Sequence, residues 1–358
     1  MEDLSLSGKA VGKFLGVVKN TITEYRMIQP CDRILVALSG GPDSVALLRT
    51  LMALRTELSI ENIGAAHLNH LLRKETAQKD QIFARNLAHE YRIPFFTRSL
   101  DVGNLAACEK LSMEAAGRKA RYDFFHQLAA EHGFTRIATG HNRDDNAEQV
   151  LMALIRGAGP TGMKGIAPIR GIIIRPLIRL AKSRITEFLD WIDQDFVVDA
   201  SNEDPVFLRN RIRNQLIPLL EKEYNPNIRK TLDRNAAIFQ EDESFWETLT
   251  EKTYPQCIAF SDPGEVGLKI SSLLELPPAL VNRILRKALF QIKTNLHRIS
   301  LVHIRAIRTL MTESPSGKTL DLPGQIRIYK NRQILSVRKE SLPLRKLGRK
   351  KHPHSMPG

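Results

Sequence analysis

The sequence is poor in cysteine, with only Cys31, Cys108 and Cys257 among 358 residues and no C-x-x-C pair. Zinc ribbons, iron–sulfur sites and disulfide frameworks need paired or clustered cysteines, so these are expected to be structural thiols. No run of about 18 apolar residues, which a membrane-spanning helix requires, is present. The first 20 residues have their apolar positions broken by Gly and Lys, unlike a signal peptide. We therefore expect a cytoplasmic protein without a membrane segment.

Acidic residues are also comparatively few, because 39 Asp and Glu face 53 Lys and Arg, which gives a net charge of +14. Such an excess favours polyanionic partners, above all nucleic acid, through counterion release. A basic protein with no such partner fits the charge alone equally well. The apolar share of 42% is typical of globular proteins, and the length allows one large domain with one or two smaller modules.

Short apolar runs alternate with longer amphipathic stretches in the first half of the chain. The predicted strands cover 33–39, 62–68, 95–99 and 135–139, and the predicted helices cover 43–55, 75–91, 113–132 and 146–156. Repeated βα units of this length predict an α/β fold with a doubly wound, mainly parallel sheet. In such a sheet, ligands bind at the carboxyl ends of the strands.

The second half of the chain has a different pattern. It contains helical patterns at 183–193, 208–221 and 228–249, a Pro- and Gly-containing linker at 255–267, further helices at 277–292 and 301–311, and a turn-rich strand region at 320–337. We expect a main domain over 1–220, then a helical connector with a small C-terminal α+β module over 221–340. The last segment, 341–358, has basic residues but no acidic one, which predicts a mobile basic tail.

The strongest local motif is Ser39-Gly40-Gly41-Pro42-Asp43-Ser44, between an apolar strand and an amphipathic helix. Two glycines let the backbone N–H groups approach an anion, and the helix start adds its positive dipole end. Both serines can hydrogen-bond phosphate oxygens, and Asp43 can hold Mg²⁺ on a leaving diphosphate. The alternative is a simple strand-to-helix turn. We favour a phosphate site because glycines, hydroxyls and a carboxylate occur together at a strand end.

Polar residues follow two other elements of the same sheet. His67 and Asn69 end the second strand, where contact with adenine and simple loop packing are both open interpretations. Arg118 lies with Glu114, Arg121 and Tyr122 on one side of a predicted helix, by steps of three and four residues. This face either grips phosphate through guanidinium groups or is an exposed, salt-bridged surface.

A cluster of carboxylates follows the fourth strand, in the segment that begins with Gly140 and His141. Asp144, Asp145 and Glu148 lie within one helical turn of one another. Helix starts favour acidic residues for capping alone. Three carboxylates at the ligand-binding edge of the sheet indicate more, namely a site for a cationic amine or Mg²⁺.

Taken together, these motifs resemble the tRNA(Ile)-lysidine synthetases, which belong to the N-type ATP pyrophosphatases, or PP-loop superfamily. The resemblance covers about Asp32 to Leu220, and residues 316–324 resemble the C-terminal module of the family. The motifs are SGGPDS at 39–44, HLNHLLR at 67–73, E-x3-R-x2-R-Y at 114–122, GHNRDDNAEQ at 140–149, RGAG at 156–159, RPLI at 175–178 and D-x-S-N-x-D-x4-R-N-x-I-R at 199–213.

The resemblance implies that ATP adenylates the C2 oxygen of the wobble cytidine in an isoleucine tRNA with a CAU anticodon. The ε-amine of free lysine then displaces AMP and leaves lysidine. Which carboxylate binds lysine and which accepts its proton stays open. Many family members carry a further C-terminal subdomain, which this chain is expected to lack.

The implied roles can be stated residue by residue. The predicted ATP contacts are Ser39, Gly40, Gly41, Pro42, Asp43, Ser44, His67, Asn69, Arg118, Gly140 and His141; the catalytic residues are Asp43, Arg118, Asp144, Asp145 and Glu148; lysine binds Asp145 and Glu148; tRNA binds Arg209, Arg211 and Arg213; and Mg²⁺ binds Asp43. A dimer is compatible with the sequence. The rival interpretations are another PP-loop tRNA-modifying enzyme, of the 2-thiocytidine type, and a nonenzymatic RNA-binding protein.

Overall fold

The computed structural model describes residues 8–69, 71, 74–198 and 208–341. His70, Arg73, the 199–207 part of the last motif, and all of the predicted basic tail beyond Ser341 lie outside the described residues. The chain divides into two compact units, 1–240 and 241–358. The functional boundary expected at residue 220 stays a prediction.

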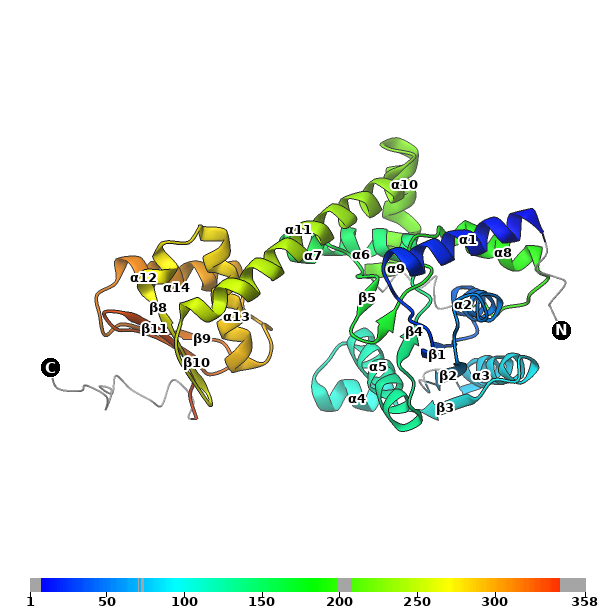
Figure 1. The fold of residues 1–358 in the computed structure, drawn as a ribbon, viewed down its shortest axis with the longest axis horizontal. Coiled ribbons are helices and arrows are strands. Elements are labelled where there is room, and N and C mark those ends of the chain that lie inside the picture. Colours follow the sequence, from blue (N-terminus) through cyan, green and yellow to red (C-terminus); the bar gives the residue numbers. More distant parts are fainter. Residues whose placement is uncertain (1–7, 70, 72–73, 199–207, 342–358) are drawn as a thin grey trace. The chain divides into compact units, whose positions relative to one another are not determined.

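The first unit contains a six-stranded sheet in the order β3-β2-β1-β4-β6-β5 (Figure 1). Its strands are β1 (Arg33–Ala37), β2 (Asn62–Asn69), β3 (Phe95–Ser99), β4 (Arg136–Ala138), β5 (Ile169–Arg170) and β6 (Ile173–Ile174). All neighbours pair in parallel except the short β5–β6 hairpin. The predicted doubly wound, mainly parallel sheet is therefore confirmed.

Helices account for most of the remaining described chain. In the first unit they are α1 (Lys9–Glu24), α2 (Pro42–Ala53), α3 (Lys74–Glu90), α4 (Val102–Glu109), α5 (Met113–His132), α6 (Arg143–Ile155), α7 (Pro160–Met163), α8 (Lys182–Trp191), α9 (Leu208–Arg211), the π-helical η3 (Ile212–Leu216), α10 (Ile217–Glu223) and the start of α11 (Ile228–Cys257). Within the described ranges, every helix is too short or too polar to span a membrane.

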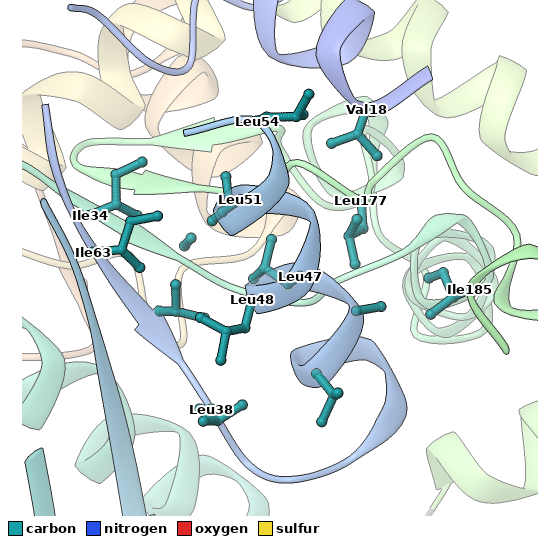
Figure 2. Close-up of a cluster of buried hydrophobic side chains, with 14 of the residues drawn as sticks. Val18, Ile34, Leu38, Leu47, Leu48, Leu51, Leu54, Ile63, Leu177 and Ile185 are labelled. Atoms are coloured by element: carbon teal, nitrogen blue, oxygen red, sulfur yellow. The ribbon is translucent and has the colours of Figure 1, made fainter. Parts of the chain in front are cut away.

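Alternating side chains of the strands divide the core of this sheet into two layers. Ile34 and Ile63 belong to one layer with residues of α1, α2, α3 and α8, and Figure 2 shows α2 leucines packed beside them. Leu35 and Ile137 belong to the opposite layer with residues of α4 and α5. Because both faces are covered, the ligand-accessible part of the sheet is its edge, where the strands end.

The second unit contains an antiparallel sheet in the order β7-β8-β11-β10-β9. Its elements are the end of α11, β7 (Ile258–Asp262), β8 (Glu265–Lys269), α12 (Ile270–Leu274), α13 (Pro278–Lys293), α14 (Leu301–Glu313), β9 (Thr319–Leu322), β10 (Ile326–Lys330) and β11 (Ile334–Lys339). Its core joins residues of α12, α13 and α14 to the inner side chains of the sheet. The small C-terminal α+β module is thus confirmed.

The linker predicted at 255–267 is wrong. Pro255 lies inside the last turns of α11, and β7 and β8 form a hairpin over the rest of the segment. The Pro263-Gly264 pair makes the turn of this hairpin, and Gly264 takes a φ of +89°. Pro-Gly is a strong turn signal. Here β7 and β8 pair on either side of the turn, so the segment forms a hairpin.

Candidate functional site

The phosphate loop joins β1 to α2 and adopts the conformation that its glycines allow. Gly40 has a φ of +93°, and Gly41 is the N-cap of α2 with Pro42 at its first turn. The hydroxyl of Ser44 donates to the Gly41 carbonyl at 2.9 Å and accepts from the Ser39 N–H at 3.1 Å. The loop therefore presents the start of a 12-residue helix at the carboxyl end of a central strand.

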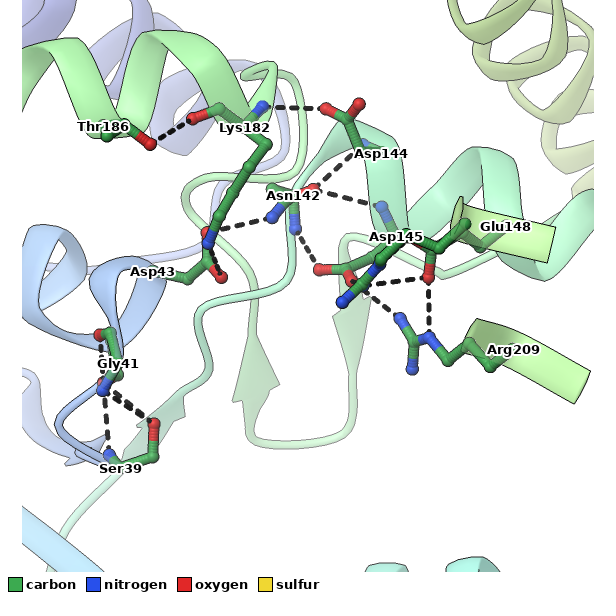
Figure 3. Close-up of polar contacts among 12 residues, drawn as sticks. Ser39, Gly41, Asp43, Asn142, Asp144, Asp145, Glu148, Lys182, Thr186 and Arg209 are labelled. Carbon is green, nitrogen blue, oxygen red and sulfur yellow. Dashed lines mark hydrogen bonds and ion pairs between the residues drawn. The ribbon is translucent and has the colours of Figure 1, made fainter. Parts of the chain in front are cut away.

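Asp43 stands at the start of α2 and has two polar partners from distant segments. Its carboxylate accepts a hydrogen bond from Asn142 Nδ2 at 3.0 Å and pairs with Lys182 Nζ at 2.5 Å (Figure 3). Burial raises the pKa of Asp43 above its ordinary value, although Lys182 opposes this shift. Lys182, at the start of α8, was not among the predicted site residues. The sequence around Lys182 does not indicate an ion pair with Asp43, because the two residues are 139 positions apart.

Gly140 brings the end of β4 against the phosphate loop. A Cβ atom at this position would lie 3.0 Å from the carbonyl carbon and oxygen of Asp43. The order of the strands reverses at β1: β2 and β3 follow on one side of it, and β4 and β6 lie on the other side. The loop therefore occupies the switch point of the sheet, which is where parallel α/β folds bind their ligands.

Asn142 caps α6 and connects it to the phosphate loop. Its side-chain oxygen accepts from the N–H groups of Asp144 at 2.9 Å and Asp145 at 3.0 Å, while Asp145 Oδ2 accepts from the Asn142 N–H at 3.0 Å. This is a capping box, in which two backbone N–H groups are satisfied reciprocally. The pattern N-x-x-D before an apolar run is the sequence signal that would have identified Asn142.

The two predicted lysine ligands form ion pairs with two of the three predicted tRNA ligands. Glu148 is fully buried and accepts from Arg209 Nε at 2.7 Å and from Arg213 Nε at 2.5 Å. Asp145 Oδ1 accepts from Arg209 Nη2 at 2.7 Å and from Arg213 Nη2 at 3.0 Å. Figure 3 shows Asp145, Glu148 and Arg209 beside Asn142. Burial works against both guanidinium charges, but the carboxylates outweigh it and raise the pKa of each arginine.

The third carboxylate of the predicted catalytic cluster and the third predicted tRNA ligand lie elsewhere. Asp144 accepts from the Lys182 N–H at 2.7 Å and from Arg229 Nη1 at 2.7 Å, so it joins α6 to α8 and α11. Arg211 is exposed. Spacing in the sequence grouped three carboxylates and three arginines, whereas the fold brings together two of each.

Burial disfavours the protonated form of both histidines of the predicted ATP site. His67 is buried, its Nδ1 lies 2.9 Å from the Leu38 carbonyl, and burial lowers its pKa. His141 Nδ1 lies 3.0 Å from the Thr139 hydroxyl, and burial lowers the pKa of His141 to about 3. Asn69 is buried and donates to Gln81 Oε1 at 3.3 Å.

Arg118 lies on α5. It is exposed, and its guanidinium carbon lies 5.0 Å from the centre of the Tyr122 ring. Its roles in ATP binding and catalysis remain predictions.

The N-terminus of α2 lies at the switch point of a parallel sheet, and Asp43 lies in its first turn. These features are typical of a nucleotide-binding α/β domain. The comparison with protein families agrees, because residues 14–220 match the PP-loop domain and residues 268–333 match the TilS substrate binding domain. Among solved structures, the U34-tRNA thiolase NcsA from Methanococcus maripaludis has a similar fold, with a TM-score of 0.55 at 18% identity, over 65% of this chain and 79% of that one.

Curated relatives define the family more closely. The chain is 36% identical over 318 residues to tRNA(Ile)-lysidine synthase of Clostridium tetani, which covers 88% of this chain and 67% of the relative. It is 40% identical over 311 residues to the enzyme of the same name from Geobacter sulfurreducens, which covers 86% of this chain and 65% of the relative. The chain thus spans about two thirds of the length of these relatives. It belongs to the tRNA(Ile)-lysidine synthase family, as its motifs predicted.

Proposed function

We propose that this protein ligates free lysine to C2 of the wobble cytidine in isoleucine tRNA with a CAU anticodon, with ATP as co-substrate. The C2 oxygen attacks the α-phosphorus of ATP and diphosphate leaves. The lysine ε-amine then attacks C2, and AMP leaves with that oxygen. The observation that carries the proposal is the loop at 39–44, at the switch point of the sheet in a member of this family.

The loop and its neighbours suit the adenylation step. The N–H groups at the start of α2 and the hydroxyls of Ser39 and Ser44 are suited to phosphate oxygens. Asp43 fits a Mg²⁺ ion, because its carboxylate is 28% exposed and already attracts the cationic Lys182. Mg²⁺ in nucleotide sites takes one or two carboxylates and completes its shell with phosphates and water. When bound, it would neutralise charge on the triphosphate.

Lysine binding is assigned to Asp145 and Glu148. The ε-amine has an unperturbed pKa of about 10.4 and must lose a proton before it attacks C2. Both carboxylates already pair with Arg209 and Arg213, so the lysine ammonium group would displace part of these contacts and share the carboxylate oxygens with the two arginines. We assign proton acceptance to the same pair, once the ammonium group has displaced the arginine contacts that help to lower the pKa of Asp145.

The RNA would reach the site past the arginines of α9 and η3. Arg211 is exposed and suits a phosphate contact, while Arg209 and Arg213 retain guanidinium edges beyond their carboxylate contacts. The basic segment 341–358 adds seven cationic side chains if its two histidines are protonated, and five otherwise. We propose that it strengthens tRNA binding and that the protein works in the cytoplasm.

Nucleoside analysis of isoleucine tRNA tests the proposal directly. After incubation with ATP, Mg²⁺ and labelled lysine, we expect lysidine at the wobble position, and at least a hundredfold less with Asp43→Asn, because one carboxylate at the phosphoryl-transfer site is lost. Asp190→Asn, an exposed position on α8, is the matched control and should retain full activity. Incorporation of sulfur in place of lysine would favour the thiolation rival, and unchanged tRNA would contradict both enzymatic interpretations.

A further inference from the structure

The segment that follows α8, residues 194–197, contacts the phosphate loop. The Val197 N–H donates a hydrogen bond to the Gly40 carbonyl at 2.9 Å. A Cβ atom on Gly40 would lie 3.6 Å from Val197 Cγ2 and 3.4 Å from the Phe83 ring of α3. The loop is therefore flanked by α3 and by the 194–197 segment, and the second of these contacts it through both backbone and side chain.

The direction of one peptide group in the loop depends on this hydrogen bond. Gly40 has a φ of +93°, and a glycine adopts several backbone conformations at little cost because it has no Cβ. The Gly40 carbonyl and the Gly41 N–H belong to the same planar, trans peptide group, so they point in opposite directions. Because Val197 binds the carbonyl, the Gly41 N–H points away from Val197. The Gly41 nitrogen lies 3.4 Å from the Ser39 hydroxyl, which is long for a hydrogen bond, so its N–H can donate to a phosphate oxygen.

The 194–197 segment is itself held in place by α2, the helix that begins at the loop. Gln194 Oε1 accepts a hydrogen bond from Arg49 Nη1 at 2.8 Å. Arg49 lies on α2 and is 5% exposed. Phe196 packs against the core layer that contains the α2 leucines. The two side chains that precede Val197 thus fix its N–H relative to the helix whose N-terminus faces the ligand.

We propose that Val197 is a positioning residue for the phosphate loop, because its N–H holds the Gly40 carbonyl away from the nucleotide and directs the Gly41 N–H toward a phosphate oxygen. The inference rests on the proposed function in one respect, namely that the loop binds the phosphates of ATP. Without the hydrogen bond, the Gly40–Gly41 peptide would turn its carbonyl oxygen toward the phosphate in part of the molecules, and the two would repel each other. Val197 therefore raises the affinity for phosphate by preorganising the loop, without contact to the phosphate itself.

Hydrogen exchange of the Val197 amide tests this coupling in the wild type. If the Val197 hydrogen bond raises the affinity for phosphate by some factor, bound phosphate must stabilise that hydrogen bond by the same factor. One hydrogen bond corresponds to about fivefold to tenfold, so saturating ATP should slow exchange of the Val197 amide by that amount. The Gln194 amide is the control, because it lies in the same segment but donates to the Leu189 carbonyl at 3.0 Å. Its exchange rate should change less than about twofold.

Val197→Pro removes the N–H, and Val197→Thr is the matched control that retains it. Val197 is half-buried, so the threonine hydroxyl can reach water. Isothermal titration without tRNA or lysine measures the affinity of each variant for ATP and for inorganic diphosphate. Val197→Pro should lower both affinities by the same factor, about fivefold to tenfold, and Val197→Thr should bind both probes as the wild type does. A larger loss for ATP than for diphosphate would contradict the inference, because it would show that contacts with adenosine are lost as well.

Two other results would overturn the inference. One is an unchanged exchange rate of the Val197 amide at saturating ATP, and the other is wild-type affinity of a folded Val197→Pro variant for both probes. If proline disrupts the fold, which the melting temperature shows, the exchange measurement decides alone. A wild type that binds ATP and diphosphate but does not incorporate lysine would count only against the proposed function.

Discussion

Glu148→Gln tests how strongly the carboxylate and arginine cluster holds the first unit together. Glu148 is fully buried and accepts three hydrogen bonds, from Arg209 Nε at 2.7 Å and from Arg213 Nε at 2.5 Å and Nη2 at 3.0 Å. Glutamine retains the shape but removes the charge, and its NH₂ group must then face a guanidinium donor. Breaking a buried ion pair on one side costs about 3 to 5 kcal/mol. The arginine side chains are 30% and 34% exposed, so screening reduces the expected loss to about 2 to 3 kcal/mol.

Urea unfolding followed by tryptophan fluorescence measures this loss. The chain has two tryptophans, Trp191 in the first unit and Trp246 in the second, so a Trp246→Phe background makes the signal specific for the first unit. With a urea dependence of about 2 to 3 kcal/mol per M, the unfolding midpoint should fall by roughly 1 M. Glu187→Gln is the matched control, because Glu187 pairs with Arg184 at 2.5 Å where both side chains are over 40% exposed. It should cost less than about 0.5 kcal/mol.

The refuting result is a Glu148→Gln midpoint equal to that of Glu187→Gln. It would mean that the buried carboxylate contributes no more than an exposed one, and that Arg209 and Arg213 are held in place by something other than charge.

Two further predictions concern the loop and its neighbour. Gly140→Ala should weaken ATP binding about tenfold and lower stability by about 1 to 3 kcal/mol, because the new Cβ would lie 3.0 Å from the Asp43 backbone; calorimetry of ATP binding should find Gly159→Ala, which has open space around its Cβ, unaffected. His141 stays neutral in the folded state down to about pH 3 but takes up a proton near pH 6.5 when unfolded, so the wild type should lose up to about 1.4 kcal/mol per pH unit below pH 6.5. His141→Gln should remove that part of the slope between pH 5 and 6.5, and an NMR titration that placed the His141 pKa near 6.5 would contradict the reasoning.

Local patterns in the sequence predicted much of the fold. The helix at 113–132 and the strand at 95–99 agree with α5 and β3 at both ends, because capping residues and apolar runs define them locally. The two-residue strands β5 and β6 carry no periodicity, and α1 and α4 were not identified. The hairpin at 258–269 was not predicted, because Pro-Gly indicates a turn in a linker as well as in a hairpin, and the two strands beside it are only five residues long.

The candidate site was predictable only where its functional residues are close together in the sequence. The loop at 39–44 is predictable because its glycines, serines and aspartate are consecutive in the sequence. The partner of Glu148, in contrast, lies 61 positions away at Arg209, and a four-residue spacing of arginines indicates a common helix face but not what that face contacts. Lys182 could not be found for the same reason, because its contact with Asp43 depends on the order in which strands and helices meet in the folded chain.

The planar amide of Asn142 has two chemically opposite ends, and the fold uses both. Its oxygen serves two backbone donors of α6, and its nitrogen serves the Asp43 carboxylate at 3.0 Å. Aspartate caps helices as well as asparagine does, yet at position 142 it would turn an acceptor toward another acceptor and set two negative charges face to face. The choice of residue at the start of one helix is thus dictated by the first turn of another, so neither can change its chemistry alone.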